Sequence, residues 1–588
     1  MASSKPGLFA REATGLVREI GFTLGVIIIL SHVVGLGWQK RAFQFTGPRP
    51  VPTNELLLGL PAIFWAFFVC GIIVLITGYA SGYVTAAMPR SGGGYVTISR
   101  VTHPILGYMS GWLMFLAEGF SYGLIGVACF EAIGIFYNIA LAPEIIGWAN
   151  DPVVLFIGGL AVVWIFAIIA LLGTKLYGRL MHVLFWIPAI ITIAFFAMWI
   201  AGAMDPSLTA TGVQEVMSTT ELTVTPGYLM NLAVDSGMTA TENISDFYGA
   251  FSFALAGAFW AYMGWYSTTF VAGEVKEANK KLPKVVVMAG LIIMLVYLAA
   301  SSASAFSTMN VPLGPEIDGA YYTDAAGNRW DFFQAYSWLS YGGVDWTALG
   351  VPADVIEAGT QWDYLNVNFQ SAWSTGIASL VARGMNLAWL SWIIALAGVL
   401  WLANDIPPFL LVASRTFFAM SFDRMLPESF AYVSEKWHAP VWSIIITAVA
   451  GIFGCIAEVE PLLGTSYFAF AGVVGTDIFD AFFLTMFCLS CMLLPLERRE
   501  IYDRAAVRHS IGTVVFLGLV ATLLSGYCLY TFVSESLWIF KPGPDEIYST
   551  AGFFLCIIIG VLLYIYHLYK NTTRGIDVRT LYMSIPPE

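Results

Sequence analysis

Long apolar runs separated by short polar segments dominate the hydrophobic pattern of this chain. A helix that crosses a membrane needs about 20 apolar residues, because each residue adds about 1.5 Å and the hydrocarbon layer is about 30 Å thick. Runs of this kind predict twelve membrane-spanning helices, near residues 20–45, 57–88, 105–140, 151–173, 177–203, 248–273, 285–308, 384–414, 440–458, 463–494, 510–534 and 549–569.

Composition supports an all-α integral membrane protein. Of the 588 residues, 58% are hydrophobic and only 11% are charged, whereas about a quarter of the residues in soluble domains are charged. The 20 Trp and 27 Tyr suit the two membrane–water interfaces. The first apolar run lacks a cleavage site of small residues, so we interpret it as a helix and not as a signal peptide.

The positions of lysine and arginine predict how the chain crosses the membrane. Basic residues favour cytoplasmic loops, and in this chain they occur before the first span and in alternate loops, most densely at 276–284. With an even number of spans, this pattern makes residues 1–19 and 570–588 cytoplasmic tails of a plasma-membrane protein. The basic residues at 40–49 are the exception, because they fall on the outer side.

Two predicted outer loops, 204–247 and 309–375, have the opposite charge. They carry fourteen acidic residues and one arginine, which accounts for the formal net charge of −12. A solvated acidic surface is one interpretation. The other is a vestibule that concentrates cations or cationic substrates.

Glycines interrupt two of the spans. Residues Gly35-Leu36-Gly37 lie within the first span, and Met263-Gly264-Trp265 lies within the sixth. A glycine costs a helix about 1 kcal/mol relative to alanine, and lipid tolerates a broken helix only where the freed backbone meets protein or lines a cavity. Close packing through small residues would explain one interruption. Two, at equivalent places in two halves, favour a transporter that holds its substrate there.

Each interruption offers a different set of backbone groups. N–H groups at the start of the half-helix after the first break attract an anion such as a carboxylate. Carbonyl groups near Ala261 at the second break can accept hydrogen bonds from an ammonium group. Trp265 follows Gly264 directly, so its ring can cover a bound substrate and act as a gate.

Four motifs resemble those of the amino acid–polyamine–organocation permeases. Residues 88–104 are similar to the loop after the second helix of this family, 259–283 to its sixth helix and exit, and 414–427 to the stretch after its eighth helix. Gly35-Leu36-Gly37 matches the glycine motif of the first helix. The motifs occur in family order, and the pattern of spans extends over nearly the whole chain.

The resemblance implies a five-plus-five inverted repeat of the leucine-transporter type, with discontinuous helices 1 and 6 and two extra helices. It places the first repeat at 20–203, the second at 248–494 and the extra helices at 495–569. It implies that amino acids or related amines are moved by alternating access, and that residues 90–94 form a mobile inner loop. The implied site consists of Gly35, Leu36 and Gly37 for the carboxylate, Ala261, Tyr262, Met263 and Gly264 for the ammonium, and Trp265 as the gate.

Ionisable residues within the spans are candidates for ion coupling, because each is costly in lipid. We single out His32 at the first break, Glu118 in the third span and Asp405 in the eighth. In the implied fold Asp405 approaches His32, and such a pair can carry a proton. A hydrogen bond from Asp405 to backbone freed by Pro407-Pro408 is the alternative. For Glu118 the alternatives are the substrate ammonium or a partner within the third helix.

Two more acids, Asp477 and Asp480, share one face of the tenth span. We expect them to pair with each other or with an outer basic residue such as Lys40 or Arg41. The residue after the sixth-helix aromatic is Tyr266, where many relatives have an acid, so coupling through a charge at that position is not supported.

The sequence therefore predicts a secondary active permease for amino acids or related amines, coupled to protons. An exchanger or a sodium symporter of the same fold is an alternative, and so is a membrane sensor that binds amino acids without moving them. The chain has no GxxxxGK[ST] motif for nucleotide binding, and its scattered histidines do not suggest haem. We expect no enzyme activity, cofactor, metal site or nucleic-acid partner.

Overall fold

The computed structural model describes residues 16, 18–140, 151–218, 223–342, 344 and 373–587. Within these residues, eleven helices are long and apolar enough to cross a membrane. The remaining predicted span is a shorter helix of 16 residues, α10. The chain is thus an all-α, multi-pass membrane protein, as predicted. Most of the N-terminal tail and residues 345–372 of the second acidic loop lie outside the described part.

The elements fall into three groups. The helices of the predicted spans are α1 (Phe22–Val33) with α2 (Leu36–Gln44), α3 (Ala62–Ala87), α5 (Pro104–Ala140), α6 (Pro152–Leu171), α7 (Thr174–Met204), α10 (Phe247–Tyr262), α11 (Ala278–Met309), α16 (Ala388–Phe422), α17 (Val441–Val459), α18 (Val473–Glu497), α20 (Ile511–Ser536) and α21 (Pro544–Thr573). The connecting helices and strands are α4 (Gly93–Val101), α8 (Ser207–Met217), α9 (Pro226–Asp235), β1 (Tyr322–Thr323), β2 (Arg329–Trp330), α12 (Phe332–Tyr341), α15 (Ser374–Gly384), α19 (Arg499–Arg504) and α22 (Val578–Met583). Short 3₁₀ turns are η1 (Thr53–Glu55), η2 (Leu57–Gly59), η5 (Ser267–Phe270), η6 (Ala272–Glu274), η7 (Glu428–Ala431), η8 (Glu460–Leu463) and η9 (Ala469–Ala471).

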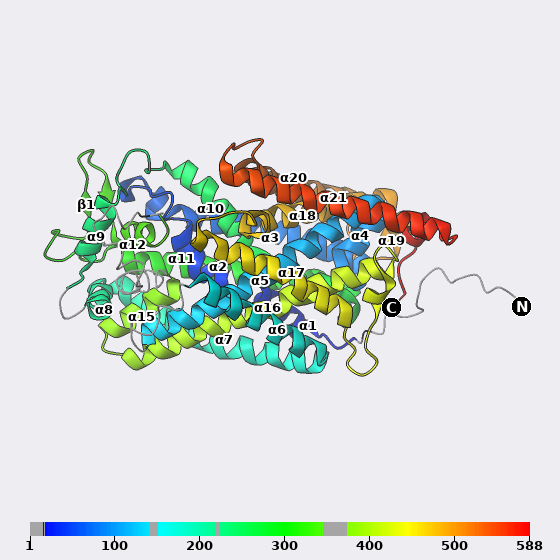
Figure 1. Cartoon of the computed structure of the whole chain (residues 1–588), viewed down its shortest axis with the longest axis horizontal. Helices are drawn as coiled ribbons and strands as arrows, with labels where there is room; N and C mark the ends of the chain where they lie inside the picture. Colours follow the sequence, from blue (N-terminus) through cyan, green and yellow to red (C-terminus); the bar gives the residue numbers. More distant parts are fainter. Residues whose placement is uncertain are drawn as a thin grey trace, which may run out of the picture.

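The helix bundle has two distinct ends (Figure 1). One end carries α8, α9, α12, α15 and the β1–β2 hairpin, and we call it the loop side. The other end carries α19 and the C-terminus, and we call it the terminal side. The two acidic loops of the sequence therefore lie together on one side of the molecule.

Side chains in the sequence fix where several helices begin. The Asp151 carboxylate accepts hydrogen bonds from the backbone N–H groups of Val153 and Val154, and Pro152 occupies the first position of α6. Asp246 caps α10 in the same way through the N–H of Gly249, at 2.7 Å. Such caps satisfy N–H groups that have no partner within the helix.

Helices α5 and α16 form the centre of the bundle. They pack against each other and are almost wholly buried. The 37 residues of α5 extend about 55 Å, which is more than a membrane requires and confirms the expected excess length. At the periphery, α7, α20 and α21 expose large apolar side chains such as Ile193, Leu523 and Leu562, which suits contact with lipid.

Two expectations about individual spans are wrong. The sixth span does not resume as an α-helix after its break, because residues 267–274 form η5 and η6. Their backbone groups bind other segments instead: Gly92 N–H donates to Phe270 O at 2.7 Å, and Ile20 N–H donates to Glu274 O at 3.0 Å. The tenth span is not unusually long, because the apolar run from 463 includes η9 and α18 begins only at Val473.

Candidate functional site

The first helix is broken between α1 and α2. Val34 and Gly35 leave the helical conformation, with φ −133° and ψ −106° at Gly35. The first N–H of α2, on Leu36, hydrogen-bonds the carboxylate of Asp405 from α16. A Cβ on Gly35 would lie 2.2 Å from Asp405 Oδ2, so only glycine allows this approach. The predicted anion-binding end of α2 therefore holds a carboxylate that belongs to the protein.

The sixth helix is broken where α10 ends, at Tyr262. Gly264 has φ +93°, in the left-handed region that favours glycine. A Cβ on Gly264 would lie 2.4 Å from Cγ of His32, and one on Gly37 would lie 2.6 Å from Cβ of Ala261. The two breaks are thus in direct contact, and all of the predicted binding residues are buried.

Tyr297 of α11 joins the two breaks. Its hydroxyl lies within hydrogen-bonding distance of Ala261 O, at 2.7 Å, and also of Val33 O. A tyrosine hydroxyl has a single hydrogen to donate, so it can satisfy only one of these carbonyls at a time. This residue was not predicted from the sequence, since nothing near Tyr297 in the chain marks it.

His32 lies beside Glu118 of α5. His32 Nε2 and Glu118 Oε2 are 3.1 Å apart, and both side chains are fully buried. The two groups are close enough to form an ion pair, but neither carries a well-aligned hydrogen bond within the described part of the chain. The ring of Phe409 packs edge-on against His32, with centroids 4.2 Å apart. The structure therefore pairs His32 with Glu118 rather than with Asp405.

Asp405 does not bind the backbone freed by the prolines of its own helix. The hydroxyl of Tyr177 donates to Pro407 O instead. Asp405 Oδ1 has no hydrogen-bond partner among the described residues, and the carboxylate interacts electrostatically with Glu118. Asp405 thus faces the first break with one oxygen bound and the other free to accept.

The candidate gate and the paired acids of α18 have other neighbours. The Trp265 ring is fully buried against the rings of Phe259 and Tyr266, with centroids 5.5 and 5.0 Å away. Tyr266 donates a hydrogen bond to Asp480, whereas Asp477 interacts electrostatically with Arg41. The expectation of a basic partner thus fits Asp477, while Asp480 is bound to a tyrosine that the sequence pattern does not link to it.

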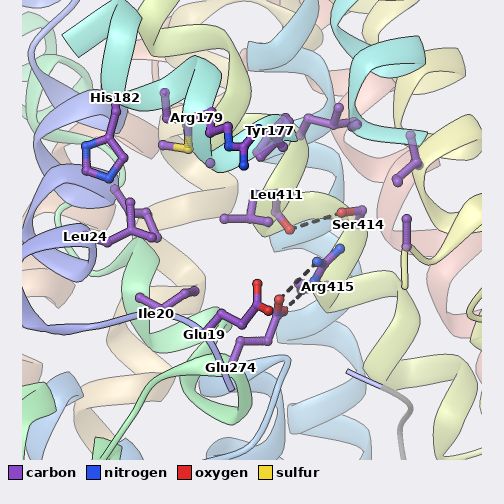
Figure 2. Close-up of a pocket in the computed structure, with 17 residues that line it drawn as sticks. Glu19, Ile20, Leu24, Tyr177, Arg179, His182, Glu274, Leu411, Ser414 and Arg415 are labelled. Carbon is purple, nitrogen blue, oxygen red and sulfur yellow. Dashed lines mark hydrogen bonds and ion pairs between the residues drawn. The ribbon is translucent and has the colours of Figure 1, made fainter. Parts of the chain in front are cut away.

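A cavity of about 280 Å³ lies nearer the terminal side. Figure 2 shows residues of α7, including Arg179 and His182, on one side of it and the ion pair between Arg415 and Glu274 on the other. The pair joins Arg415 Nε to Glu274 Oε1 at 2.8 Å. Leu410 on the cavity wall is five residues from Asp405, or about 7.5 Å by helical rise. The cavity therefore extends from the terminal side toward the breaks.

A buried cluster closes the terminal side next to this cavity. Arg100 donates two hydrogen bonds to the Asp423 carboxylate, at 2.6 and 2.7 Å, and Tyr95 donates a third at 2.8 Å. The Tyr582 hydroxyl lies 3.0 Å from that of Tyr95. Tyr582 belongs to residues 577–587, which we call the C-terminal segment. The sequence predicted a cytoplasmic tail for these residues, but not that they dock.

The C-terminal segment is held by backbone acceptors. Arg90 Nε donates to Pro586 O at 2.6 Å, Arg498 Nη2 donates to Met583 O at 2.9 Å, and the Arg100 guanidinium lies over the Tyr582 ring at 5.0 Å. The predicted inner loop, 90–94, lies against this segment and against residues 270–271. The C-terminal segment is thus part of the terminal-side closure.

No group of three or more His, Cys, Asp or Glu side chains among the described residues is arranged to hold a metal ion. All seven cysteines are free and buried. These facts leave the broken helices as the chemically distinctive place in the bundle.

Comparison with known families decides the classification. The amino acid permease family matches residues 23–564, which is nearly the whole chain. The chain belongs to the amino acid permease family. Its relatives are membrane transporters and not enzymes, as the motifs of the sequence predicted.

Several curated proteins are similar to parts of this permease. The serine/threonine exchanger SteT of Bacillus subtilis is 24% identical over 290 residues, which cover 49% of the permease and 54% of SteT. The b(0,+)-type amino acid transporter 1 of mouse is 23% identical over 294 residues, covering 50% and 52%. Solute carrier family 7 member 12 of mouse is 23% identical over 337 residues, covering 55% and 60%. The permease thus spans about half the length of the curated relatives it matches.

Proposed function

We propose that this permease is a secondary active transporter that carries amino acids or related amines across the plasma membrane by alternating access. The observation that carries the proposal is the contact between two broken helices at the centre of the bundle, where Gly264 lies against His32 and Gly37 against Ala261. Freed backbone groups at such breaks are where transporters of this type bind their substrates. The names of the relatives, which transport or exchange amino acids, support the same class of substrate.

In this proposal the substrate lies between residues 35–37 and residues 261–264, and Trp265 acts as the gate. Residues 20–203 and 248–494 act as the two repeats that move relative to each other. The cavity beside α7 and α16 supplies the path to the terminal side, which faces the cytoplasm together with both chain ends. The basic residues 276–284 on that side support this orientation.

The coupling ion in this proposal is the proton, and the His32–Glu118 pair carries it. An imidazole and a carboxyl group 3.1 Å apart in a fully buried site can share one proton, since burial makes separate charges costly. Asp405 lies near enough to feel the charge of Glu118. Substrate binding beside Gly264 would touch the His32 ring directly, which links substrate and proton.

Exchange without a proton is the second candidate, because one relative is named as a serine/threonine exchanger. The two candidates differ in what drives accumulation. A symporter concentrates substrate when a pH gradient alone is imposed, whereas an exchanger needs substrate on the opposite side of the membrane.

The binding site is tested with tryptophan substitutions in proteoliposomes. Gly37→Trp and Gly264→Trp fill the contact between the breaks, so we expect counterflow of amino acids or amines to fall to background while the protein still inserts. Gly512→Trp is the matched control, because a side chain at Gly512 meets no atom closer than 4.0 Å. Uptake by the Gly264→Trp variant at the level of the control would refute the site.

The coupling ion is tested with Glu118→Gln in the same vesicles. We expect accumulation driven by a pH gradient to disappear while counterflow continues, because the variant can still bind substrate but holds no titratable carboxyl group beside His32. Unchanged accumulation would remove the pair from the coupling mechanism. Accumulation that requires sodium in the wild-type protein would remove the proton.

A further inference from the structure

The binding end of α2 is already filled by an acid. The N-terminus of a helix attracts anions because its first N–H groups have no partner within the helix. In this permease the Leu36 N–H binds the Asp405 carboxylate. A Cβ placed on Gly35 would be within 2.7 Å of three atoms of Asp405, so no second carboxylate fits between this side chain and the backbone.

We infer that the substrate is an amine without an α-carboxylate, and that Asp405 is the fixed anion of the binding site in place of a substrate carboxylate. This inference rests on the proposed transport function and narrows its substrate class. Three observations carry it: the occupied helix end, the sign of the charges around it, and the kind of hydrogen-bonding atoms left without partners.

The charges around the breaks are mostly negative. Asp405, Glu118 and Asp480 are 3%, 0% and 0% exposed, and Glu118 interacts electrostatically with both of the others. His32 beside Glu118 is the one basic side chain that these interactions include, since Arg41 lies over the Trp260 ring, at 4.1 Å, and near Asp477. A zwitterion would add no net positive charge to this region, whereas an amine adds one.

The polar atoms also favour a donor. Asp405 Oδ1 and both oxygens of Glu118 have no hydrogen-bond partner within the described part of the chain. The carbonyls of Val33 and Ala261 share the single hydrogen of Tyr297. An ammonium group has three N–H donors and no acceptor, whereas a carboxylate has only acceptors. The side chains of Ser31 and Asn404, which also lack partners among the described residues, can donate or accept and do not discriminate.

The acidic loop side fits the same substrate. Fourteen acidic residues in the two outer loops create a negative potential that raises the local concentration of cations. A cationic amine would be enriched on this side and would then meet further carboxylates at the breaks. This interpretation accounts for a charge pattern that transport of zwitterions leaves unexplained.

The test compares pairs of compounds that differ only in the carboxylate. Suitable pairs are tyrosine and tyramine, histidine and histamine, lysine and cadaverine, arginine and agmatine, and serine and ethanolamine. Binding to the full-length protein in lipid nanodiscs is measured by thermal shift and by competition, and transport by counterflow in proteoliposomes. At pH 7.5 we expect the amine to bind at least tenfold more tightly than its amino acid in every pair that binds.

The wild-type comparison decides the matter without a variant. If the amino acid of a transported pair binds more tightly than its amine, the inference is wrong while the proposed function stands. If amino acid affinity rises at least tenfold between pH 7.5 and 5.5 and exceeds that of the amine, Asp405 gives way to a substrate carboxylate when protonated, and the inference is again wrong. If no member of any pair is bound or transported by folded protein, the proposed function fails as well.

A variant locates the effect. Asp405→Asn removes the fixed charge and keeps the shape, so we expect amine affinity to fall at least tenfold and the affinity for the matching amino acid to rise. Glu460→Gln is the control, because Glu460 is a buried carboxylate in η8 that binds the N–H of Phe468 at 2.7 Å. Amine affinity that is unchanged in Asp405→Asn would overturn the assignment of this residue.

Discussion

The two sides of the molecule close over the breaks with different chemistry. On the terminal side, Arg100 and Asp423 form a pair of parallel hydrogen bonds at 2.6 and 2.7 Å, and both side chains are buried. On the loop side, Lys40 and Glu131 form one ion pair at 3.2 Å with side chains 10% and 13% exposed. The terminal closure also includes the C-terminal segment, whereas the loop-side pair has the Trp373 ring beside it, 5.6 Å from Lys40 Nζ.

This difference sets an expected order of opening. Removing one partner of a buried pair costs about 3–5 kcal/mol, because the other charge stays buried without compensation. An ion pair that water can reach contributes about 1 kcal/mol or less. We therefore expect the loop side to open more readily than the terminal side in the absence of substrate. Four measurements test this order, from the largest expected effect to the smallest.

Asp423→Asn should open the terminal side most strongly. The change leaves the Arg100 guanidinium without its carboxylate and destabilises the closed terminal side by about 3–5 kcal/mol. Ser414→Cys supplies a reporter, since Ser414 lines the terminal-side cavity and is 1% exposed. Its labelling rate with a hydrophilic maleimide should rise at least tenfold. The native cysteines are all buried and give a low background.

Two controls accompany this experiment. Arg100→Gln combined with Asp423→Asn leaves no buried charge, so labelling should return toward the wild-type rate. Arg499→Gln breaks an exposed pair with Asp503 and should change nothing. Equal labelling of wild-type and Asp423→Asn protein would show that this cluster does not hold the terminal side closed.

Asp331 makes the stability of the loop side depend on pH. Burial raises the pKa of this carboxyl group to about 6, above its unfolded value of about 3.9. The folded state therefore binds the proton more tightly, so this contribution is complete below about pH 4 and is lost as pH rises through about 6. The difference is up to about 3 kcal/mol. Asp331→Asn should melt at a higher temperature than wild type at pH 7, and the gap should shrink toward pH 4; a constant gap would contradict this account.

Deleting residues 577–588 should open the terminal side by a smaller amount. The deletion removes Tyr582 and the carbonyls that bind Arg90 and Arg498. Each lost hydrogen bond to a charged group is worth about 1.5–3 kcal/mol, but water replaces most of it on an open surface, so a net cost of about 1–2 kcal/mol is expected. The Ser414→Cys reporter should react several-fold faster. A rate equal to that of the full chain would mean that the segment only covers the closure and does not stabilise it.

Lys40→Met should have the smallest effect and act on the opposite side. The partly exposed pair with Glu131 contributes about 1 kcal/mol, so a cysteine at Ala132, which is 4% exposed in the wild type, should label two- to fivefold faster. Lys541→Met, which breaks an exposed pair at 3.9 Å, is the control. A larger change from Lys40→Met than from Asp423→Asn would reverse the expected order of the two sides.

The features that were predictable from the sequence are those that depend on neighbouring residues. Apolar runs predicted helix bounds to within a few residues, for example 440–458 against Val441–Val459 in the structure. The broken first helix was predictable because two glycines lie two positions apart. The turn at Gly264 was predictable for the same local reason.

The features that were not predictable depend on distant partners. Arg100 and Asp423 are 323 positions apart, and Tyr297 and Val33 are 264 apart, so no local pattern marks either contact. The end of the sixth span was misread because its apolar residues suit a helix, while its backbone bonds go to residues 20 and 92. Likewise, Glu118 could be recognised as costly in lipid, but its position beside His32 follows only from the packing of α5.

The hydroxyl of Tyr297 gives the two broken helices a shared hydrogen. Val33 O ends one helix and Ala261 O lies at the end of the other, and a rotation about the C–O bond of the phenol is enough to pass the hydrogen from one carbonyl to the other. Whichever helix lets go, the other is ready to receive the bond, so separating the halves need not leave the phenol without a partner. A phenylalanine in its place would uncouple the two motions.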